Sequence, residues 1–379
     1  MLAVSWPSRK CRLNQQQHWH SHEEAKIKLN LFIPALTGLR AFAALAVVLF
    51  HFTTDAGLHL SIVDPIIKRG YLGVDLFFVL SGFIIHHVYR RQFSREIAAN
   101  SYLEFIRNRF ARIYPVHLLT MTIMLAFFGA AALILHRAPN DPTAFSIAAI
   151  FASILLVHAW IDIPSPNIPA WSVSAEWFGY LLYPCLALVT ARLRTVSCIA
   201  VAVCAVAATE FVANNHPLLR ICPEFLLGMM AYDLRVGVSL ARPVGRFGGW
   251  LVTALLVASG YVFSGEQLGL HAALFAILIV ALSNDDDQLG HVLALPPFVY
   301  LGEISYSIYM THGPVWAIIK NIARLHNVEI SSLPLIGGSV LSVLIVSAVT
   351  FRYIELPARQ ALRSSGQRLI VEAQSPTAP

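Results

Sequence analysis

Residues 36–52 read LTGLRAFAALAVVLFHF, a stretch in which Arg40 and His51 are the only ionisable side chains. A helix needs roughly 20 mostly apolar residues to cross the hydrocarbon core of a bilayer, and we therefore predict a membrane-spanning helix over residues 31–53. The whole chain has a similar composition: of its 379 residues 57% are apolar, and only 13% are Asp, Glu, Lys or Arg. So few charges indicate an integral membrane protein and exclude a soluble enzyme or a disordered protein.

The basic residues are grouped beside the apolar segments. The net charge of +6 is also found in nucleic-acid-binding proteins, but this grouping is how a membrane protein sets its orientation. We therefore expect a lipid bilayer around the chain and no nucleic-acid partner. The five cysteines have neither CxxC spacing nor a histidine pairing that would suit a metal, so no metal site is expected.

Ten further apolar segments follow the first along the chain. They lie at about residues 70–90, 113–136, 145–159, 171–191, 196–213, 219–234, 248–263, 268–283, 298–321 and 333–355. If all eleven segments cross, three basic segments fall outside the cytoplasm, against the positive-inside rule. Ten crossings remove the conflict if 145–159, the shortest segment, is a re-entrant or buried helix. We therefore predict an all-α, polytopic membrane bundle of about ten transmembrane helices.

The same reasoning divides the chain into three parts. Residues 1–30 are expected to be a polar cytoplasmic arm, since they carry several basic residues and no secretion signal. Residues 31–360 form the integral membrane domain, and residues 361–379 form a cytoplasmic tail. Both termini are thus expected in the cytoplasm.

Arg40 and His51 are the first candidate functional residues, because ionisable groups inside spans are costly and mark function by default. Eleven residues of helix return almost to the starting angle, so both side chains project from one face, about 16 Å apart along the axis. The motif GYLGVDLFFVLSGF (70–83) places Asp75 near the depth of His51. A carboxylate beside an imidazole raises its basicity, which predicts His51 as a general base oriented by Asp75. The alternative for His51 is an interfacial residue at a helix end.

Three later motifs carry the other candidates. RFARIYP (109–115) puts Arg109 and Arg112 on one face, where they either anchor the helix or bind phosphate. PAWSVSAEWFGYLLYP (169–184) places Trp171 and Glu176 in the outer half, with His51 and Asp75, and an aromatic face with a carboxylate suits a sugar ring. YLGEISYSIYMTHGPVW (300–316) adds Tyr306 and His312 in one span.

Taken in order, these motifs together with RICPEFLLGMMAY (220–232) and FRYIELP (351–357) closely resemble the acyltransferase-3 family of integral membrane acyltransferases. The resemblance covers about residues 31–357. It implies transfer of an acyl group, commonly acetyl from acetyl-CoA, to a hydroxyl of an exported or surface glycan or of a secreted small molecule. It also implies a bacterial cytoplasmic membrane. Some members carry a C-terminal SGNH hydrolase-like domain; with no such domain, this chain is expected to be a stand-alone member.

The resemblance and the residue pattern predict one mechanism. Family knowledge makes Arg40 and His51 an essential pair, with Asp75, Arg109, Arg112, Trp171 and Glu176 as further candidates. The arginines Arg40, Arg109 and Arg112 would bind acyl-CoA, and His51, oriented by Asp75, would act as general base or as an acyl relay. Glu176 is a third catalytic candidate; Trp171, Tyr306 and His312 would contact the acceptor.

A multi-span transporter or flippase is the competing function, in which the intramembrane charges form a pathway. The sequence contains no paired repeats or matching broken helices in two halves, which favours the acyltransferase. The expected partners are acyl-CoA, a glycan or small-molecule acceptor and the bilayer. A separate polysaccharide-assembly protein is one further partner that the resemblance allows.

Overall fold

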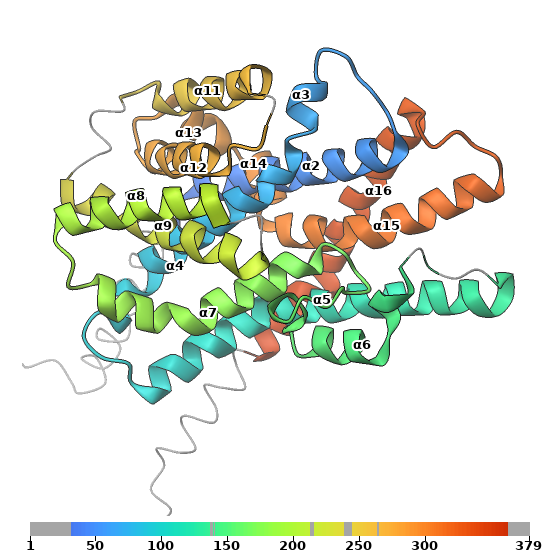
Figure 1. The fold of residues 1–379 in the computed structure, drawn as a ribbon, viewed down its shortest axis with the longest axis horizontal. Helices are drawn as coiled ribbons and strands as arrows, with labels where there is room; N and C mark the ends of the chain where they lie inside the picture. Colours follow the sequence, from blue (N-terminus) through green and yellow to red (C-terminus); the bar gives the residue numbers. More distant parts are fainter. Residues whose placement is uncertain are drawn as a thin grey trace, which may run out of the picture.

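The structure is a computed structural model, and it describes residues 32–362 apart from residues 137–138, 140, 213–215, 239–244 and 264. The predicted arm at 1–30 and nearly all of the tail at 361–379 lie outside the described residues. Within the described ranges every regular element is a helix and none is a strand, so the all-α prediction is confirmed. Figure 1 shows these helices packed side by side as one bundle.

Ten helices in the described part of the chain have 15 residues or more. They are α2 (Pro34–Ala56), α4 (Gly73–Phe93), α5 (Ala99–Leu135), α7 (Ala170–Thr190), α8 (Thr195–Val212), α9 (Pro217–Val238), α11 (Gly248–Val262), α12 (Leu268–Leu282), α15 (Ser305–Leu325) and α16 (Leu333–Thr350). Shorter helical turns connect them. These are α3 (Asp64–Ile67), η1 (Gly70–Leu72), η2 (Pro142–Phe145), α6 (Ile147–Ile154), η3 (His158–Trp160), α13 (Gln288–Leu293), α14 (Pro296–Glu303) and the π-helix η4 (Phe351–Glu355).

Five helical stretches in the described residues are long and apolar enough to cross a membrane. They contain α2, α4, α5, α7 and α16, and the shorter helices α8, α11 and α12 are also apolar. The chain is therefore an integral membrane protein, while the count of ten crossings stays a prediction. The α-helix in the segment 145–159 is the eight-residue α6, flanked by the short 3₁₀ turns η2 and η3. Eight residues rise about 12 Å, too little to cross a bilayer.

Helices α4 and α9 run parallel and pack closely along their length (Figure 1). Two glycines allow this approach: a Cβ atom on Gly82 would lie 2.0 Å from the carbonyl oxygen of Phe225, and one on Gly228 would lie 2.0 Å from that of Val79. Small residues bring membrane helices together in this way. Each end of the pair also carries a charged contact, and the contact between Asp75 and Arg220 belongs to the site.

Glycines also fix how α4 meets α2. A Cβ atom on Gly70 would lie 2.2 Å from the carbonyl oxygen of Ala46, and one on Gly73 would lie 2.5 Å from that of Ala43. Higher numbers on one chain segment meet lower numbers on the other, so the two segments are antiparallel. This register decides which residues of α2 lie at the depth of Asp75.

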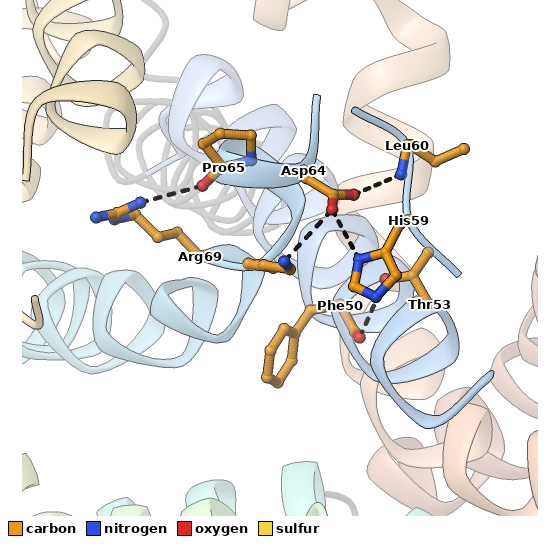
Figure 2. Close-up of polar contacts among 8 residues, drawn as sticks. Phe50, Thr53, His59, Leu60, Asp64, Pro65 and Arg69 are labelled. Atoms are coloured by element: carbon orange, nitrogen blue, oxygen red, sulfur yellow. Dashed lines mark hydrogen bonds and ion pairs between the residues drawn. The ribbon is translucent and has the colours of Figure 1, made fainter. Parts of the chain in front are cut away.

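The connection between α2 and α4 is tied down by polar contacts (Figure 2). The carboxylate of Asp64 accepts hydrogen bonds from the backbone N–H of Leu60, at 2.6 Å, and from Nδ1 of His59, at 3.0 Å. Arg69 donates to the carbonyl oxygens of Pro65 and Gly260. The connection is thus attached to the end of α11 as well as to α2.

Candidate functional site

Two adjoining cavities share lining residues of α2, α4 and α5, and arginines line both. The first has a volume of about 240 Å³. Its polar lining residues are Arg40, Ser81, Arg109, Arg112, Ser172, Glu176, Tyr180, Ser305, Tyr306 and Tyr309. The second cavity, of about 430 Å³, shares Arg40, Ile84 and Arg112 with the first and adds Arg359 and Glu303. Arg40 of α2 thus stands where the two cavities meet.

The three predicted arginines are brought together, and their hydrogen-bonding capacity is largely unused. Arg40 has no hydrogen bond or ion pair with any described residue, and its buried Nε has no partner there. Arg109 donates through Nη2 to the hydroxyl of Tyr89 at 3.3 Å, but its Nε has no partner in the described ranges. Buried guanidinium groups left in this state suit an anionic ligand such as a phosphate, which would take several charge-assisted hydrogen bonds.

Arg112 is held by a carboxylate that the sequence interpretation had not selected. Glu355 ends the π-helix η4, is fully buried, and accepts a hydrogen bond from Ser307 Oγ at 2.5 Å. Its Oε1 lies 4.0 Å from Nη1 of Arg112 and also pairs with Arg359. A π-helical turn often marks a functional position. In the sequence, the signal for this residue is that the glutamate of FRYIELP stands at the end of an apolar helix.

Glu176 lies with the arginines and not with His51. It lines the first cavity together with Arg40 and accepts a hydrogen bond from the hydroxyl of Ser81. The expectation that Glu176 and Asp75 share one layer with His51 is therefore wrong for Glu176. Depth was estimated from its position in the segment, which could not show that α7 turns this face toward α4 and α5.

His51 has one ring nitrogen committed and one available. Its Nδ1 lies 2.9 Å from the carbonyl oxygen of Val47, which can only accept, so Nδ1 carries the proton in the neutral ring. Nε2 then holds the lone pair. The ring of His312 on α15 lies 5.1 Å away between centroids, and its Nδ1 lies 2.5 Å from the carbonyl oxygen of Tyr309. Two neighbouring histidines therefore each present an Nε2 lone pair.

Asp75 does not orient His51, and that prediction is wrong. Both carboxylate oxygens of Asp75 are taken by Arg220, through Nε at 2.8 Å and Nη2 at 2.7 Å. The contacts of Gly70 and Gly73 with α2 place Asp75 beside residues 41–43, about 12 Å or more from His51 along the helix axis. The physical reason is the register between the two helices. Helix α4 packs against α2 so that Asp75 lies further from His51 than the sequence alone could indicate.

Arg220 and Glu224 are the other residues that sequence reasoning missed, although both lie in the motif RICPEFLLGMMAY. The guanidinium of Arg220 lies 5.9 Å from the ring centre of Tyr71 and 5.8 Å from that of Trp171. Glu224 lies one turn further along α9 and is fully buried beside Asp75 and Arg220. The rule that intramembrane charges mark function would have selected both.

The three predicted acceptor residues fall in different places. Trp171 packs against Arg220 and the ring of Phe78. Tyr306 lines the first cavity and donates to the carbonyl oxygen of Ile113. His312 is buried beside His51. Tyr306 therefore lies with the arginines, whereas Trp171 and His312 lie toward the other end of the site.

A short chain of contacts joins the first cavity to the two histidines. Ser172 and Tyr309 line that cavity, and their hydroxyl oxygens are 2.7 Å apart. Tyr309 then contacts His312 both through its carbonyl oxygen and ring to ring, at 5.7 Å between centroids. The cavity therefore leads from the arginines to within one side chain of the histidine pair.

Comparison with known proteins identifies the family to which this chain belongs. Residues 33–352 match the acyltransferase domain family numbered acyltransferase-3. Acyltransferase MdmB of Streptomyces mycarofaciens is 32% identical over 323 residues, which cover 74% of this chain and 78% of MdmB. YrhL of Bacillus subtilis and the peptidoglycan O-acetyltransferase OatA of Listeria monocytogenes are each 25% identical, over 91% and 87% of this chain. The chain spans only 58% of YrhL and 56% of OatA. No solved structure is significantly similar.

Proposed function

Because the chain belongs to the acyltransferase-3 family, we propose that it is an O-acyltransferase that moves an acyl group from acyl-CoA to a hydroxyl of an exported saccharide or secreted small molecule. Family membership makes this chain a membrane-embedded acyltransferase. The acyl-CoA donor, the acceptor and the mechanism are our proposals. The observation that carries the proposal is the cavity lined by Arg40, Arg109 and Arg112, whose guanidinium groups have unused donors.

The arginine-lined cavities are the donor site. Acyl-CoA carries several phosphates, and guanidinium forks bind phosphate through paired hydrogen bonds. The first cavity holds three arginines and one carboxylate, Glu176, so its lining has an excess of positive charge. The thioester arm then extends toward Ser172 and Tyr309, where the cavity ends nearest the histidines. Acetyl is the expected group, since OatA is named for O-acetyl transfer.

His51 is the catalytic base. An acceptor hydroxyl attacks the thioester carbonyl carbon and gives its proton to Nε2 of His51, the C–S bond breaks, and the proton passes to the departing thiolate. The hydrogen bond from Nδ1 to Val47 fixes the tautomer that this step needs. This backbone carbonyl takes the role that the sequence interpretation had assigned to Asp75. A relay in which His51 is acylated first uses the same nitrogen.

The arrangement of charges around the first cavity favours a donor site over the alternative function of a transporter. Arg40, Arg109, Arg112 and Glu176 line one cavity with an excess of positive charge, which suits the binding of a single anionic ligand. The family match also favours acyl transfer. Hydrolysis of acyl-CoA by the purified protein, without any gradient, separates the two functions.

Substitution of His51 tests the mechanism. We expect His51→Ala to lower acyl transfer by about two to four orders of magnitude while acetyl-CoA still binds. His59→Ala is the matched control, because His59 is exposed and bonded to Asp64 (Figure 2). Transfer is read as acetyl mass on surface polysaccharide and secreted metabolites of cells with each variant. Retained transfer at unchanged protein level contradicts both mechanisms; trapping an acyl-imidazole selects the relay.

A further inference from the structure

Beyond the donor cavity, aromatic side chains connect His51 to Arg220. The rings of His51 and Phe50 are 5.1 Å apart, and those of Phe50 and Tyr71 are 5.5 Å apart. Tyr71 in turn faces the guanidinium of Arg220 at 5.9 Å. Residues from α2, η1 and α9 thus form one continuous arc that begins at the catalytic base.

A second arc returns from Arg220 to the same histidine. Trp171 faces Arg220 at 5.8 Å, and the next residue, Ser172, bonds to Tyr309. Tyr309 contacts His312, whose ring lies 5.1 Å from that of His51. The two arcs close a circuit that we call the aromatic collar. Its members are Phe50, His51, Tyr71, Trp171, Arg220 and His312, completed by the Ser172–Tyr309 pair.

Part of the collar is accessible at the surface of the described residues. Phe50, His51, Tyr71, Trp171 and Arg220 are half-buried, whereas the parts that complete the circuit are buried, namely Ser172, Tyr309 and His312. The Ser172–Tyr309 pair is shared with the wall of the donor cavity. The collar therefore begins where the donor cavity ends, and His51 belongs to it.

We propose that the aromatic collar is the acceptor site and that it binds a neutral sugar, an inference that rests on the proposed acyltransferase function. The rings of Tyr71 and Trp171 offer apolar faces to the C–H groups of a sugar. Arg220 gives Nε and Nη2 to Asp75, whereas its Nη1 donates to no described residue and can bind a sugar hydroxyl. A hydroxyl held there belongs to the same circuit of contacts as His51 and the Ser172–Tyr309 pair of the donor cavity.

The charge balance of the collar selects a neutral ligand over an anionic one. Asp75 neutralises Arg220 through two hydrogen bonds, and Glu224 lies beside them. In either protonation state of Glu224, this group of three carries no net positive charge. An acidic sugar would find no unpaired cation at the collar, whereas a phosphate would find one at Arg40. Neutral acceptors should therefore bind better than acids of the same shape.

The test compares two glycosides that differ only in one carboxylate. Purified protein in lipid nanodiscs is given acetyl-CoA with methyl β-glucopyranoside or with the matching methyl glucuronide, and thiol release above background is followed. We expect the neutral glycoside to act at about tenfold lower concentration. No stimulation by the neutral glycoside, equal stimulation by both, or a preference for the glucuronide overturns the proposal.

Substitutions assign the preference to the collar. Trp171→Ala should raise the acceptor KM about tenfold and leave the acetyl-CoA KM unchanged, while Trp171→Phe keeps most of the affinity. Trp250→Ala, which removes an exposed tryptophan on α11, is the matched control. An equal rise in both KM values for Trp171→Ala overturns the acceptor site. Acetyl-CoA binding measured without glycoside tests the proposed function separately, because it fails only if the donor cavity is misassigned.

Discussion

Arg40 and Arg220 are both half-buried arginines in the first turns of long helices, but their surroundings are opposite. Arg220 gives two hydrogen bonds to Asp75 and lies between two aromatic rings. Arg40 has no hydrogen bond or ion pair to any residue in the described ranges. An unpaired charge in a protein interior is costly unless something else supplies the opposite charge. The comparison therefore separates an arginine that is part of the fold from one that has a place for an anionic ligand.

The largest expected effect comes from breaking the paired case. Arg220→Leu leaves Asp75 and Glu224 buried without their cation, and we expect a loss of about 3–5 kcal/mol in the free energy of unfolding. Thermal unfolding of purified protein in detergent measures the loss. The double variant Asp75→Leu with Arg220→Leu should recover most of it, because it removes a charge from each side. A double variant as unstable as the single one contradicts the pairing.

The unpaired case should respond in the opposite way. Arg40→Gln removes a charge without a partner, so stability should hold or rise, whereas affinity for acyl-CoA should fall by about 2 kcal/mol, roughly thirtyfold. Titration with a non-hydrolysable thioether analogue of acetyl-CoA measures this affinity. The control Arg69→Gln removes an arginine that bonds to Pro65 (Figure 2) and also to Gly260. This control should leave the affinity for acyl-CoA unchanged. An equal loss of affinity in both variants contradicts the assignment of Arg40 to the acyl-CoA site.

The smallest effect is expected at an ion pair whose carboxylate is exposed. Lys320 of α15 bonds to Asp55 of α2 at 2.5 Å, but Asp55 also accepts from Trp316 and is partly open to solvent. Solvent-exposed pairs contribute about 0–1 kcal/mol, so Lys320→Gln should change the free energy of unfolding by no more than about 1 kcal/mol. Thermal unfolding in the same detergent gives the value. A loss as large as that of Arg220→Leu means that burial does not govern these pairs.

The sequence was sufficient for the fold class and for the arginine group. A charge-poor chain with apolar segments allows little except a helical membrane protein. The eleven-residue spacing of Arg40 and His51 put both on one face, and in the structure both meet α15, Arg40 through a shared cavity and His51 through His312. Helical periodicity within one segment is local information, so it can be derived without knowing the neighbours.

Contacts between helices could not be derived in the same way. Asp75 and Glu176 were placed by their depth in a segment, but which face meets which neighbour depends on close approaches such as that of Gly73 to Ala43. Asp75 consequently pairs with Arg220, which is 145 residues away along the chain. Arg220 itself was passed over although it stood in a motif that carried the family resemblance. The role of His51 as a base stays a prediction, with the carbonyl oxygen of Val47 in place of Asp75 as the partner of its ring.

The close packing of α4 against α9 limits how the protein can move. Gly82 and Gly228 leave no room between the two backbones. Beyond them, Asp75 holds Arg220 at one end and Asp233 holds His86 and Arg90 at the other. Because α4 and α9 are joined at both ends and in the middle, we expect them to move as one rigid unit. A slide of one helical turn would break both groups of ion pairs at once. We therefore expect any opening that admits a substrate to come from the helices around this pair.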